Sequence, residues 1–319
     1  MAIMNKKTEK NLLGITFRGS KNETVNYLQR STIKLDKNGV LIYKIPYTDK
    51  YDYYPIFMAR YSLGNLELFL DTKDEKYKKE FFTQTDWLLK NLVFKNNFAV
   101  WEHNYKLPFY DFKTPWVHGL GQGLGMIALL KAYQITGKND YLKASEKVYN
   151  SFEVDISEGG VRYIDENDDI WLEEYALSPP PHVLNGFITI LFGIHEFQKV
   201  TKKEKPKNLW DKGIKTLKNN LEKYEAGYWS IYDLLGKYPS TLSYHELHVR
   251  QLNILHNLTG EKIFLDYAKS WEKYMNKWIN KKHANISRGM LHIKRYGIKN
   301  SIGRYIDRKK WQKQKTERG

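Results

Sequence analysis

The segment EEYALSPPPHVLNGF, residues 173–187, combines side chains that can carry protons with a backbone that holds them still. Glu173, Glu174 and Tyr175 come first, three prolines follow, and an apolar run then resembles a helix start. Each proline fixes its own φ and restricts the residue before it, so we predict a stiff extended strap. This strap should fix the direction of Glu174 and Tyr175, and Pro181 should sit in the first turn of the following helix.

Two later segments carry groups of the same kind. WSIYDL contains Tyr232, and YHELHVRQLNIL contains Tyr244, His245 and His248. Phenols, carboxylates and imidazoles can all transfer protons, which predicts general acid–base chemistry at the mouth of a cavity. The two histidines have the spacing of a metal pair, but few carboxylates lie nearby in the sequence, so we expect no metal site.

Four segments of similar pattern must position these groups. They begin at Pro55, Trp116, His182 and Tyr244, and each has an apolar first half and a more polar second half with helical spacing. Between the halves stands a threonine followed by a short polar turn. These threonines are 64, 65 and 58 residues apart: Thr72, Thr136, Thr201 and Thr259.

This repeat predicts four helical hairpins, each with a buried first helix and an amphipathic second helix outside it. Such hairpins commonly close into an (α/α) toroid whose inner helices line a central funnel, and an open solenoid is the competing architecture. We therefore expect a mainly α chain with short β-hairpins at one mouth and a small N-terminal β segment. STIKLDKNGVLIYKIPY predicts a hairpin turning at Asp36–Gly39, and GGVRYIDENDDIWLEEY one turning within DENDD.

The toroid predicts that distant residues meet. Every connection from an outer helix to the next inner helix emerges at the same end, so the side chains on these connections should converge at one mouth. They are Trp101, Glu102, Trp116, Glu174, Tyr175, Tyr232 and Tyr244. The domain division expected from the pattern is a β-rich segment at 1–54, the toroid at 55–280 and a basic tail at 281–319.

Composition narrows the class of protein. The 319 residues are 41% hydrophobic and 15% aromatic, enough for a large core, with rings to spare for a sugar-binding cleft. The absence of cysteine excludes disulfides, thiolate metal sites and cysteine nucleophiles. The N-terminus lacks the apolar core of a signal peptide, and no stretch approaches a membrane span, so we expect a cytoplasmic protein.

The net charge of +16 is concentrated at the end of the chain. Residues 281–319 hold 13 Lys and Arg against two acidic residues, which leaves +5 for the other 280. With Tyr296, Ile298, Ile302, Tyr305 and Trp311 among its cations, this tail predicts a peripheral contact with anionic lipid at the inner membrane face. No nucleic-acid module is recognisable, so we expect no nucleic-acid partner. GLGQGLG lacks the Lys-Ser/Thr ending of a phosphate-binding loop.

The quoted segments resemble a known family. EEYALSPPPHVLNGF, WSIYDL and YHELHVRQLNIL, in this order, are similar to parts of the C-terminal domain of the D-glucuronyl C5-epimerase family. WVHGLGQGLGMIALLKAY and PIFMARYSLGN are similar to two of its inner helices, so the resemblance runs from about Pro55 to Met275. It implies a toroid preceded by β structure and a carbohydrate epimerase that inverts C5 of glucuronate within a polysaccharide, giving iduronate. The implied catalytic residues are Glu174, Tyr175, Tyr232 and Tyr244.

This chain departs from the family at several positions. Leu235 stands where the family has a basic residue after IYDL, and Arg250 aligns with an asparagine. The part after about Lys281 has no counterpart. The resemblance therefore predicts the uronate chemistry and not the natural glycan or its sulfation.

The chemistry itself needs a base on one face of the ring, an acid on the other, and cations or hydrogen-bond donors at the carboxylate. It needs no cofactor. We expect Glu174 and Tyr244 to be the opposed proton-transfer pair, with Tyr175 and Tyr232 orienting the ring or sharing the proton. A phenol that acts as base should have its pKa lowered by nearby cations. The expected substrate-binding residues are Trp116, Gln122, Arg162, Asn185, His248 and Arg250.

Other functions stay open from the sequence alone. A polysaccharide lyase shares the first step, C5 proton removal, and then expels the C4 substituent. A non-catalytic binder of acidic glycan would use only the rings and the basic tail. A glycosidase could pair Glu102 with Glu174. The expected partners are an acidic uronate-containing polysaccharide or a lipid-linked glycan and, for assembly, a second copy in a homodimer.

Overall fold

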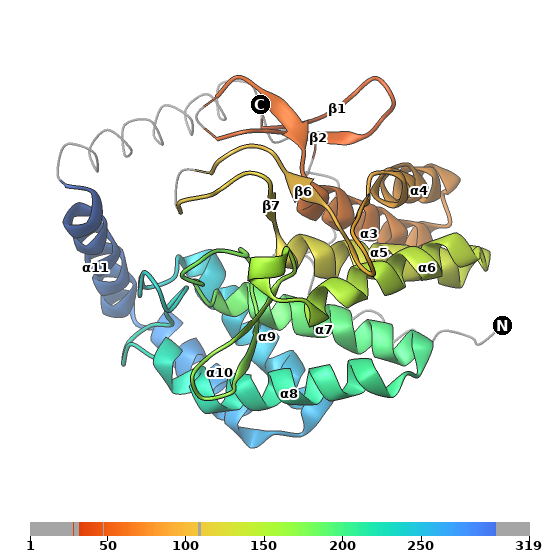
Figure 1. Cartoon of the computed structure of the whole chain (residues 1–319). Coiled ribbons are helices and arrows are strands. Elements are labelled where there is room, and N and C mark those ends of the chain that lie inside the picture. The colour runs from red at the N-terminus through yellow and green to blue at the C-terminus, as the bar shows by residue number, and fades with distance from the viewer. Residues whose placement is uncertain (1–27, 29–31, 47, 108–109, 298–319) are drawn as a thin grey trace.

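The structure, a computed structural model, describes residues 28, 32–46, 48–107 and 110–297 (Figure 1). Four helical hairpins make up most of it, as the repeat predicts. The pairs are α3 (Pro55–Thr72) with α4 (Glu75–Lys90), α5 (Gly119–Thr136) with α6 (Asn139–Asn150), α7 (Leu184–Thr201) with α8 (Glu204–Asn220), and α9 (Leu242–Thr259) with α10 (Lys262–Met275). A further helix, α11 (Trp278–Tyr296), follows them.

The repeated threonines end the four inner helices in the same way. Each is the last residue of its helix, and its hydroxyl donates to the carbonyl four residues earlier at 2.7–2.8 Å. The next residue adopts a left-handed conformation in every case and turns the chain towards the outer helix. That residue is glycine in two hairpins, Gly137 and Gly260, and lysine in the other two, Lys73 and Lys202.

The inner helices form the core. α5 packs against α3 on one side and against α7 on the other, and α7 also contacts α9. Helix α5 is buried from Gly119 to Ala132, which agrees with its mostly apolar sequence, whereas its outer partner α6 is amphipathic. The predicted mainly α fold, an (α/α) toroid of four hairpins, is confirmed (Figure 1).

Short strands occupy the end at which the inner helices begin (Figure 1). The two predicted hairpins are present, and the first gains a third strand. The antiparallel sheets are β1 (Ile33–Leu35), β2 (Leu41–Lys44) and β3 (Tyr51–Tyr53); β4 (Val93–Phe94) and β5 (Ala99–Val100); β6 (Glu102–His103) and β7 (Trp116–Val117); and β8 (Arg162–Ile164) and β9 (Ile170–Leu172). Short 3-10 turns at Ser151–Glu153, Ile156–Glu158 and Leu221–Tyr224 complete the connections.

Backbone hydrogen bonds join the connections into one rim. His118 and Tyr175 form an antiparallel bridge, and Gly119 N donates to Glu174 O at 2.8 Å. Leu184 N donates to Tyr232 O at 3.1 Å on the next side of the rim. The segments that carry the predicted chemistry are thereby held against one another, although they are far apart in sequence.

The prediction for Pro181 is wrong. Helix α7 begins at Leu184, because His182 has a positive φ of 50° that no helix can include. Pro181 instead lies in the strap, where its carbonyl accepts from Leu234 N at 2.9 Å. The proline therefore anchors the strap to the Tyr232 segment rather than starting the helix.

Candidate active site

Glu174 is a buried carboxylate at the mouth, with 4% of the residue exposed. Asn185 Nδ2 donates to its Oε2 at 3.3 Å, and His118 Nε2 lies 3.6 Å from its Oε1. Gly186 gives the carboxylate its room, since a Cβ there would lie 2.3 Å from Glu174 Oε2. The side chain is thus fixed from three sides by residues that begin α5 and α7.

The tautomer of His118 follows from its contacts. Burial, followed by the charges of His103 and Arg60, holds the pKa of His118 well below 6.5, so the ring is neutral near pH 7. Its Nδ1 accepts from Gly121 N at 3.1 Å, which leaves the ring proton on Nε2. That nitrogen lies 3.6 Å from Glu174 Oε1, so His118 is a neutral neighbour of the carboxylate without a direct hydrogen bond to it.

Phenols surround Glu174. Tyr232 and Tyr244 contact each other edge to face, with ring centroids 4.8 Å apart. The charge of Glu174 acts on Tyr54, Tyr175 and Tyr232, and Tyr244 acts on the same three. The four residues expected to be catalytic are therefore close enough to interact, as the convergence of the connections predicts.

The expected lowering of a phenol pKa is not found for two of these residues. Burial, followed by the charge of Glu174, raises the pKa of both Tyr175 and Tyr232 well above 10. The physical reason is that the mouth is dry and its nearest charge is negative, which disfavours a phenolate. Both side chains are neutral phenols, suited to donating a hydrogen bond or a proton.

An aromatic wall stands behind Tyr175. Its ring lies 4.9 Å from His118, 5.3 Å from Tyr110 and 5.7 Å from Phe112, measured between centroids. Trp116 completes the wall at 6.2 Å. The wall excludes water from one side of the site and keeps the Tyr175 ring in place.

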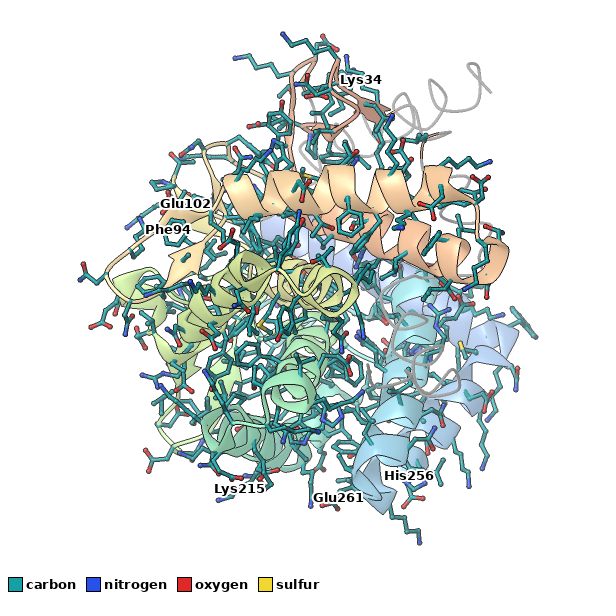
Figure 2. All side chains as sticks on the ribbon, turned by 90° about the vertical axis from the view of Figure 1, so that its right-hand side faces the viewer. Lys34, Phe94, Glu102, Lys215, His256 and Glu261 are labelled. Carbon is teal, nitrogen blue, oxygen red and sulfur yellow. The ribbon has the colours of Figure 1, made fainter. Side chains whose placement is uncertain are left out.

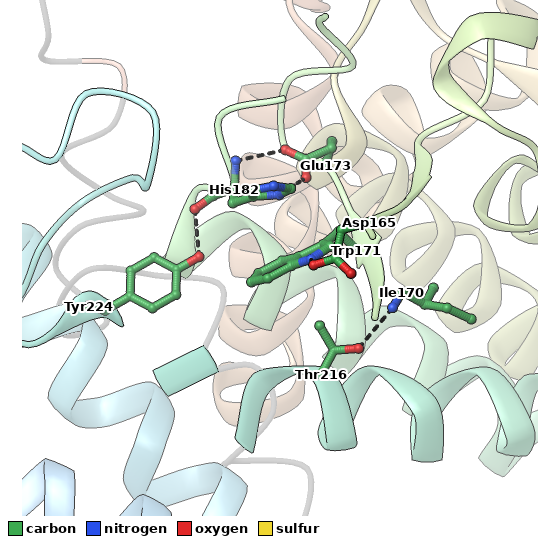
Figure 3. A network of polar contacts seen from close by, with 7 residues as sticks. All are labelled: Asp165, Ile170, Trp171, Glu173, His182, Thr216 and Tyr224. Atoms are coloured by element: carbon green, nitrogen blue, oxygen red, sulfur yellow. Dashed lines mark hydrogen bonds and ion pairs between the residues drawn. The ribbon is translucent and has the colours of Figure 1, made fainter. Parts of the chain in front are cut away.

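Glu173, next to Glu174, has a structural position. Its carboxylate accepts from His182 Nδ1 at 2.5 Å and from His182 N at 3.0 Å, and Tyr224 Oη donates to His182 O at 2.7 Å (Figure 3). The His182 ring packs on Trp171 with centroids 4.2 Å apart. This clamp ties the two ends of the proline strap together and so sets the direction of Glu174.

Of the two arginines expected to bind the carboxylate, Arg162 lies near Glu153, and Arg250 lies on the same inner helix as Tyr244. Arg162, on the β8–β9 hairpin, has its Nη1 3.9 Å from Oε2 of Glu153, which lies in the 3-10 turn Ser151–Glu153. Arg250 is on α9, six residues after Tyr244, so the two side chains leave the helix about 120° apart. Arg60, on α3, acts on His118, and its buried Nε has no hydrogen-bond partner. Arg60 is thus a cation of the site that the sequence analysis did not select.

Three expected substrate-binding residues are instead built into the core. The amide of Gln122 bonds both N and O of Trp101, at 3.3 and 3.2 Å. Trp116 is 3% exposed, and its indole donates to Tyr105 O at 2.6 Å. His248 is fully buried, with Nδ1 2.9 Å from Ser230 Oγ. Their contacts place them in the core around the site, and their contact with a substrate stays a prediction.

Asn185 lies beside Glu174. It is 2% exposed, its amide nitrogen holds Glu174, and its Oδ1 is buried with no hydrogen-bond partner. A buried acceptor of this kind is costly unless something donates to it. Asn185 can therefore accept from a hydroxyl group placed next to Glu174.

Glu102 is separated from Glu174 by the pairing of β6 with β7. It ion-pairs with Lys95 at 2.7 Å and lies at the outer edge of the molecule near Phe94 (Figure 2). Its neighbour His103 points to the opposite face of the strand, where its ring packs against Trp116 with centroids 4.4 Å apart. This geometry does not favour the paired-carboxylate glycosidase.

A shared signal could have identified the residues that sequence reasoning missed. Tyr54 and His118 each stand directly before the first residue of an inner helix, at α3 and α5. Because every inner helix begins at the mouth, its preceding residue must lie there too. Tyr110 and Arg60 carry no such positional signal.

Comparisons with known proteins identify the family of the chain. A family model described as D-glucuronyl C5-epimerase C-terminus matches residues 95–273, more than half of the chain. The chain belongs to this family. The part of the chain that matches the epimerase family includes Glu174, Tyr175, Tyr232 and Tyr244, while Tyr54 and Arg60 lie before it.

Two curated relatives share this region. An uncharacterized protein of Methanocaldococcus jannaschii is 34% identical over 210 residues, which is 62% of this chain and 68% of that protein. The D-glucuronyl C5-epimerase of Caenorhabditis elegans is 28% identical over 222 residues, or 63% of this chain. This stretch is 35% of the worm protein, so the chain spans about a third of that relative.

Solved structures of low sequence identity share the fold. A GH76 α-mannanase of Bacteroides thetaiotaomicron has a TM-score of 0.53 at 12% identity, covering 82% of this chain and 70% of that one. The unsaturated glucuronyl hydrolase of Bacillus sp. GL1 has a TM-score of 0.50 at 14% identity, covering 84% of this chain and 83% of that one.

Among the described residues, no helix combines the length and apolar character of a membrane span.

Proposed function

We propose that this chain is a uronate C5-epimerase, which converts D-glucuronate residues of a glycan to L-iduronate by removing and returning the C5 proton. The observation that carries the proposal is one buried carboxylate, Glu174, surrounded by the phenols of Tyr175, Tyr232 and Tyr244 at the mouth. Membership of the epimerase family supports the reaction class, and the name of the worm relative supports the sugar.

The reaction needs negative charge to be stabilised at the sugar carboxylate. Breaking the C5–H bond sends its electron pair into the carboxylate, which then carries two negative charges. The inner helices α3, α5, α7 and α9 all begin at the mouth, so their positive ends favour an anion there. Arg60 is our proposed partner for the sugar carboxylate. It would take the role of the basic residue that the family has at the position of Leu235.

Glu174 is the proposed base for the C5 proton on one face of the ring. Its position is fixed by Asn185, His118 and Gly186, which a proton-transfer group requires. Tyr244 is the proposed acid that delivers a proton to the other face, and Tyr232, in contact with its ring, is next in line to resupply it. Each positioned group contributes roughly 10²–10⁴ in rate.

Neutral phenols fit the remaining roles. Since Tyr175 and Tyr232 stay protonated near pH 7, they can donate hydrogen bonds to the charge that develops on the carboxylate. The buried Oδ1 of Asn185 can accept from a sugar hydroxyl. All of these steps use side chains of the chain itself.

The substrate is proposed to be an acidic uronate-containing polysaccharide or a lipid-linked glycan. We propose the same division of the chain as the sequence suggests, with the toroid as the reacting unit. The boundary predicted at 280 falls inside α11, so the described part of the basic segment is helical. Residues 298–319, including Ile298, Ile302, Tyr305 and Trp311, lie outside the described residues, and their contact with lipid stays a prediction.

Product analysis tests the proposal. The protein is incubated with heparosan and other glucuronate polymers, and the products are followed by NMR and by ultraviolet absorbance. We expect iduronate within an intact polymer. An unsaturated uronate would identify a lyase, shortened saturated chains would identify a glycosidase, and binding without any product would identify a glycan-binding protein; each of these results contradicts the proposal.

A further inference from the structure

Helix α11 faces the protein with its polar and small side chains. Ala284 is buried against the body, and Tyr228 Oη donates to Ser287 Oγ at 3.2 Å. Arg288 Nη1 donates to Ser240 O at 3.0 Å. These positions share one side of the helix, so α11 is attached largely by polar contacts.

The opposite side of α11 is apolar and exposed. A helix of a globular protein normally turns such a face towards the core. Its large side chains have these exposed fractions: Trp278 70%, Ile279 55%, Ile286 50%, Met290 65% and Ile293 44%. At about 100° per residue they fall within a stripe roughly 120° wide. These side chains therefore share one face of the helix.

Lys281 and Lys294 border the stripe, and Lys282 lies within it. Lys281, Lys282 and Lys294 are exposed, and α11 contains no Asp or Glu. Bulky apolar side chains with Trp on one face, flanked by lysines, are typical of helices that lie in a membrane interface. The lysines would meet the negative surface potential of anionic lipid.

We propose that α11 is an interfacial helix that inserts Trp278, Ile286 and Met290 into the surface of a membrane containing anionic lipid. Charge selects this occupant over the other candidates. Residues 1–27 carry five Lys and Arg against two Glu, and residues 298–319 carry eight against two acidic residues. Neither segment complements the lysines, and a second copy would bring the same cations to the contact.

The attachment of α11 links this surface to the candidate site. Tyr228 and Ser240, its contacts, flank the segment that carries Tyr232 and leads into α9 with Tyr244. Docking would bring that segment close to the lipid, where a lipid-linked glycan would arrive. This consequence rests on the proposed function, whereas the docking itself does not.

Vesicle co-sedimentation of the full chain tests the proposal. The vesicles are phosphatidylcholine alone and phosphatidylcholine with phosphatidylglycerol, at low and high salt. We expect binding to the anionic vesicles that weakens with salt. In the Ile286→Glu/Met290→Glu variant the partition coefficient should fall at least ~10-fold, because two charges replace apolar groups that would be buried in the bound membrane.

Phe94→Glu is the matched control, since Phe94 is 63% exposed on β4 and is labelled in Figure 2. It should bind like the unchanged protein. All variants should unfold at the same temperature and act equally on soluble polymer, which separates this test from the reaction assay.

Three results would overturn the proposal. The first is no binding to anionic vesicles, and the second is binding that survives the Ile286/Met290 change and is lost only on removal of residues 298–319. The third is a dimer in solution that the same change dissociates, since the stripe would then be covered by a second copy.

Discussion

Gly186→Ala should lower the rate of epimerisation strongly while changing the stability of the fold only a little, because it displaces Glu174. The new Cβ would lie 2.3 Å from Glu174 Oε2 and 2.4 Å from Glu174 Cβ, both far closer than the 3.4–4 Å of ordinary contact. Helix α7 is buried over most of its length and cannot easily move away. The Glu174 side chain must therefore shift by roughly 1 Å, the size of misplacement that costs about 10²-fold in rate.

The same change should alter stability only modestly. Alanine favours a helix over glycine by about 1 kcal/mol, whereas overpacking costs about 1–3 kcal/mol. The two effects oppose each other, so we expect a net loss of no more than about 2 kcal/mol. The variant should fold, and its loss of rate should exceed anything its stability explains.

Gly193→Ala is the matched control on the same helix. Gly193 lies seven residues after Gly186 on α7, away from Glu174. A Cβ at Gly193 would lie 3.0 Å from Gly123 O. Both variants are assayed for epimerisation of a glucuronate polymer well below their unfolding temperatures. We expect about 100-fold loss for Gly186→Ala and near-normal rate for Gly193→Ala. Equal rates in the two variants, with comparable unfolding temperatures, would refute the placement of Glu174 at the reacting centre.

Four further predictions follow from individual contacts. Tyr244→Phe should lower solvent deuterium incorporation at C5 by at least about 10²; undiminished exchange would remove Tyr244 from the mechanism. Glu102→Gln should leave kcat unchanged, since Glu102 pairs with Lys95; a large loss would revive the two-carboxylate glycosidase. Glu173→Gln should lower stability by about 1–3 kcal/mol by thermal unfolding, because it weakens the clamp on His182; an unchanged unfolding temperature would contradict the clamp. Burial lowers the pKa of His103 from 6.5 to about 3, so below pH 6.5 the unfolded chain binds a proton that the folded chain does not. Stability should therefore fall between pH 6.5 and 3, and His103→Gln should flatten that fall; equal slopes would show that another group is responsible.

The architecture could be predicted because the sequence repeats one local pattern, an apolar helix, a threonine and an amphipathic helix, four times. Thr72, Thr136, Thr201 and Thr259 cap the ends of the inner helices, and their spacing fixed the number of hairpins. The convergence of Glu174, Tyr175, Tyr232 and Tyr244 followed from the direction of those helices. Both features depend on the order and direction of the helices and not on individual side-chain contacts.

The remaining errors arose where tertiary contacts outweigh local pattern. His248 and Gln122 are polar residues on inner helices, and the sequence cannot tell a core hydrogen bond from a ligand contact. Arg162 was expected at the site for its charge, but its neighbour is Glu153, in the 3-10 turn that precedes the hairpin. Arg60 was missed because only its closeness to His118, across two helices, brings it to the mouth.

Deuterium incorporation tests the central claim most directly. A glucuronate polymer is incubated with the protein in D₂O, and C5 of both glucuronate and iduronate is followed by NMR, with Glu174→Gln as the comparison. The account predicts deuterium at C5 of the iduronate formed by the unchanged protein and none with the variant. Conversion without deuterium, or equal exchange by both proteins, would contradict it.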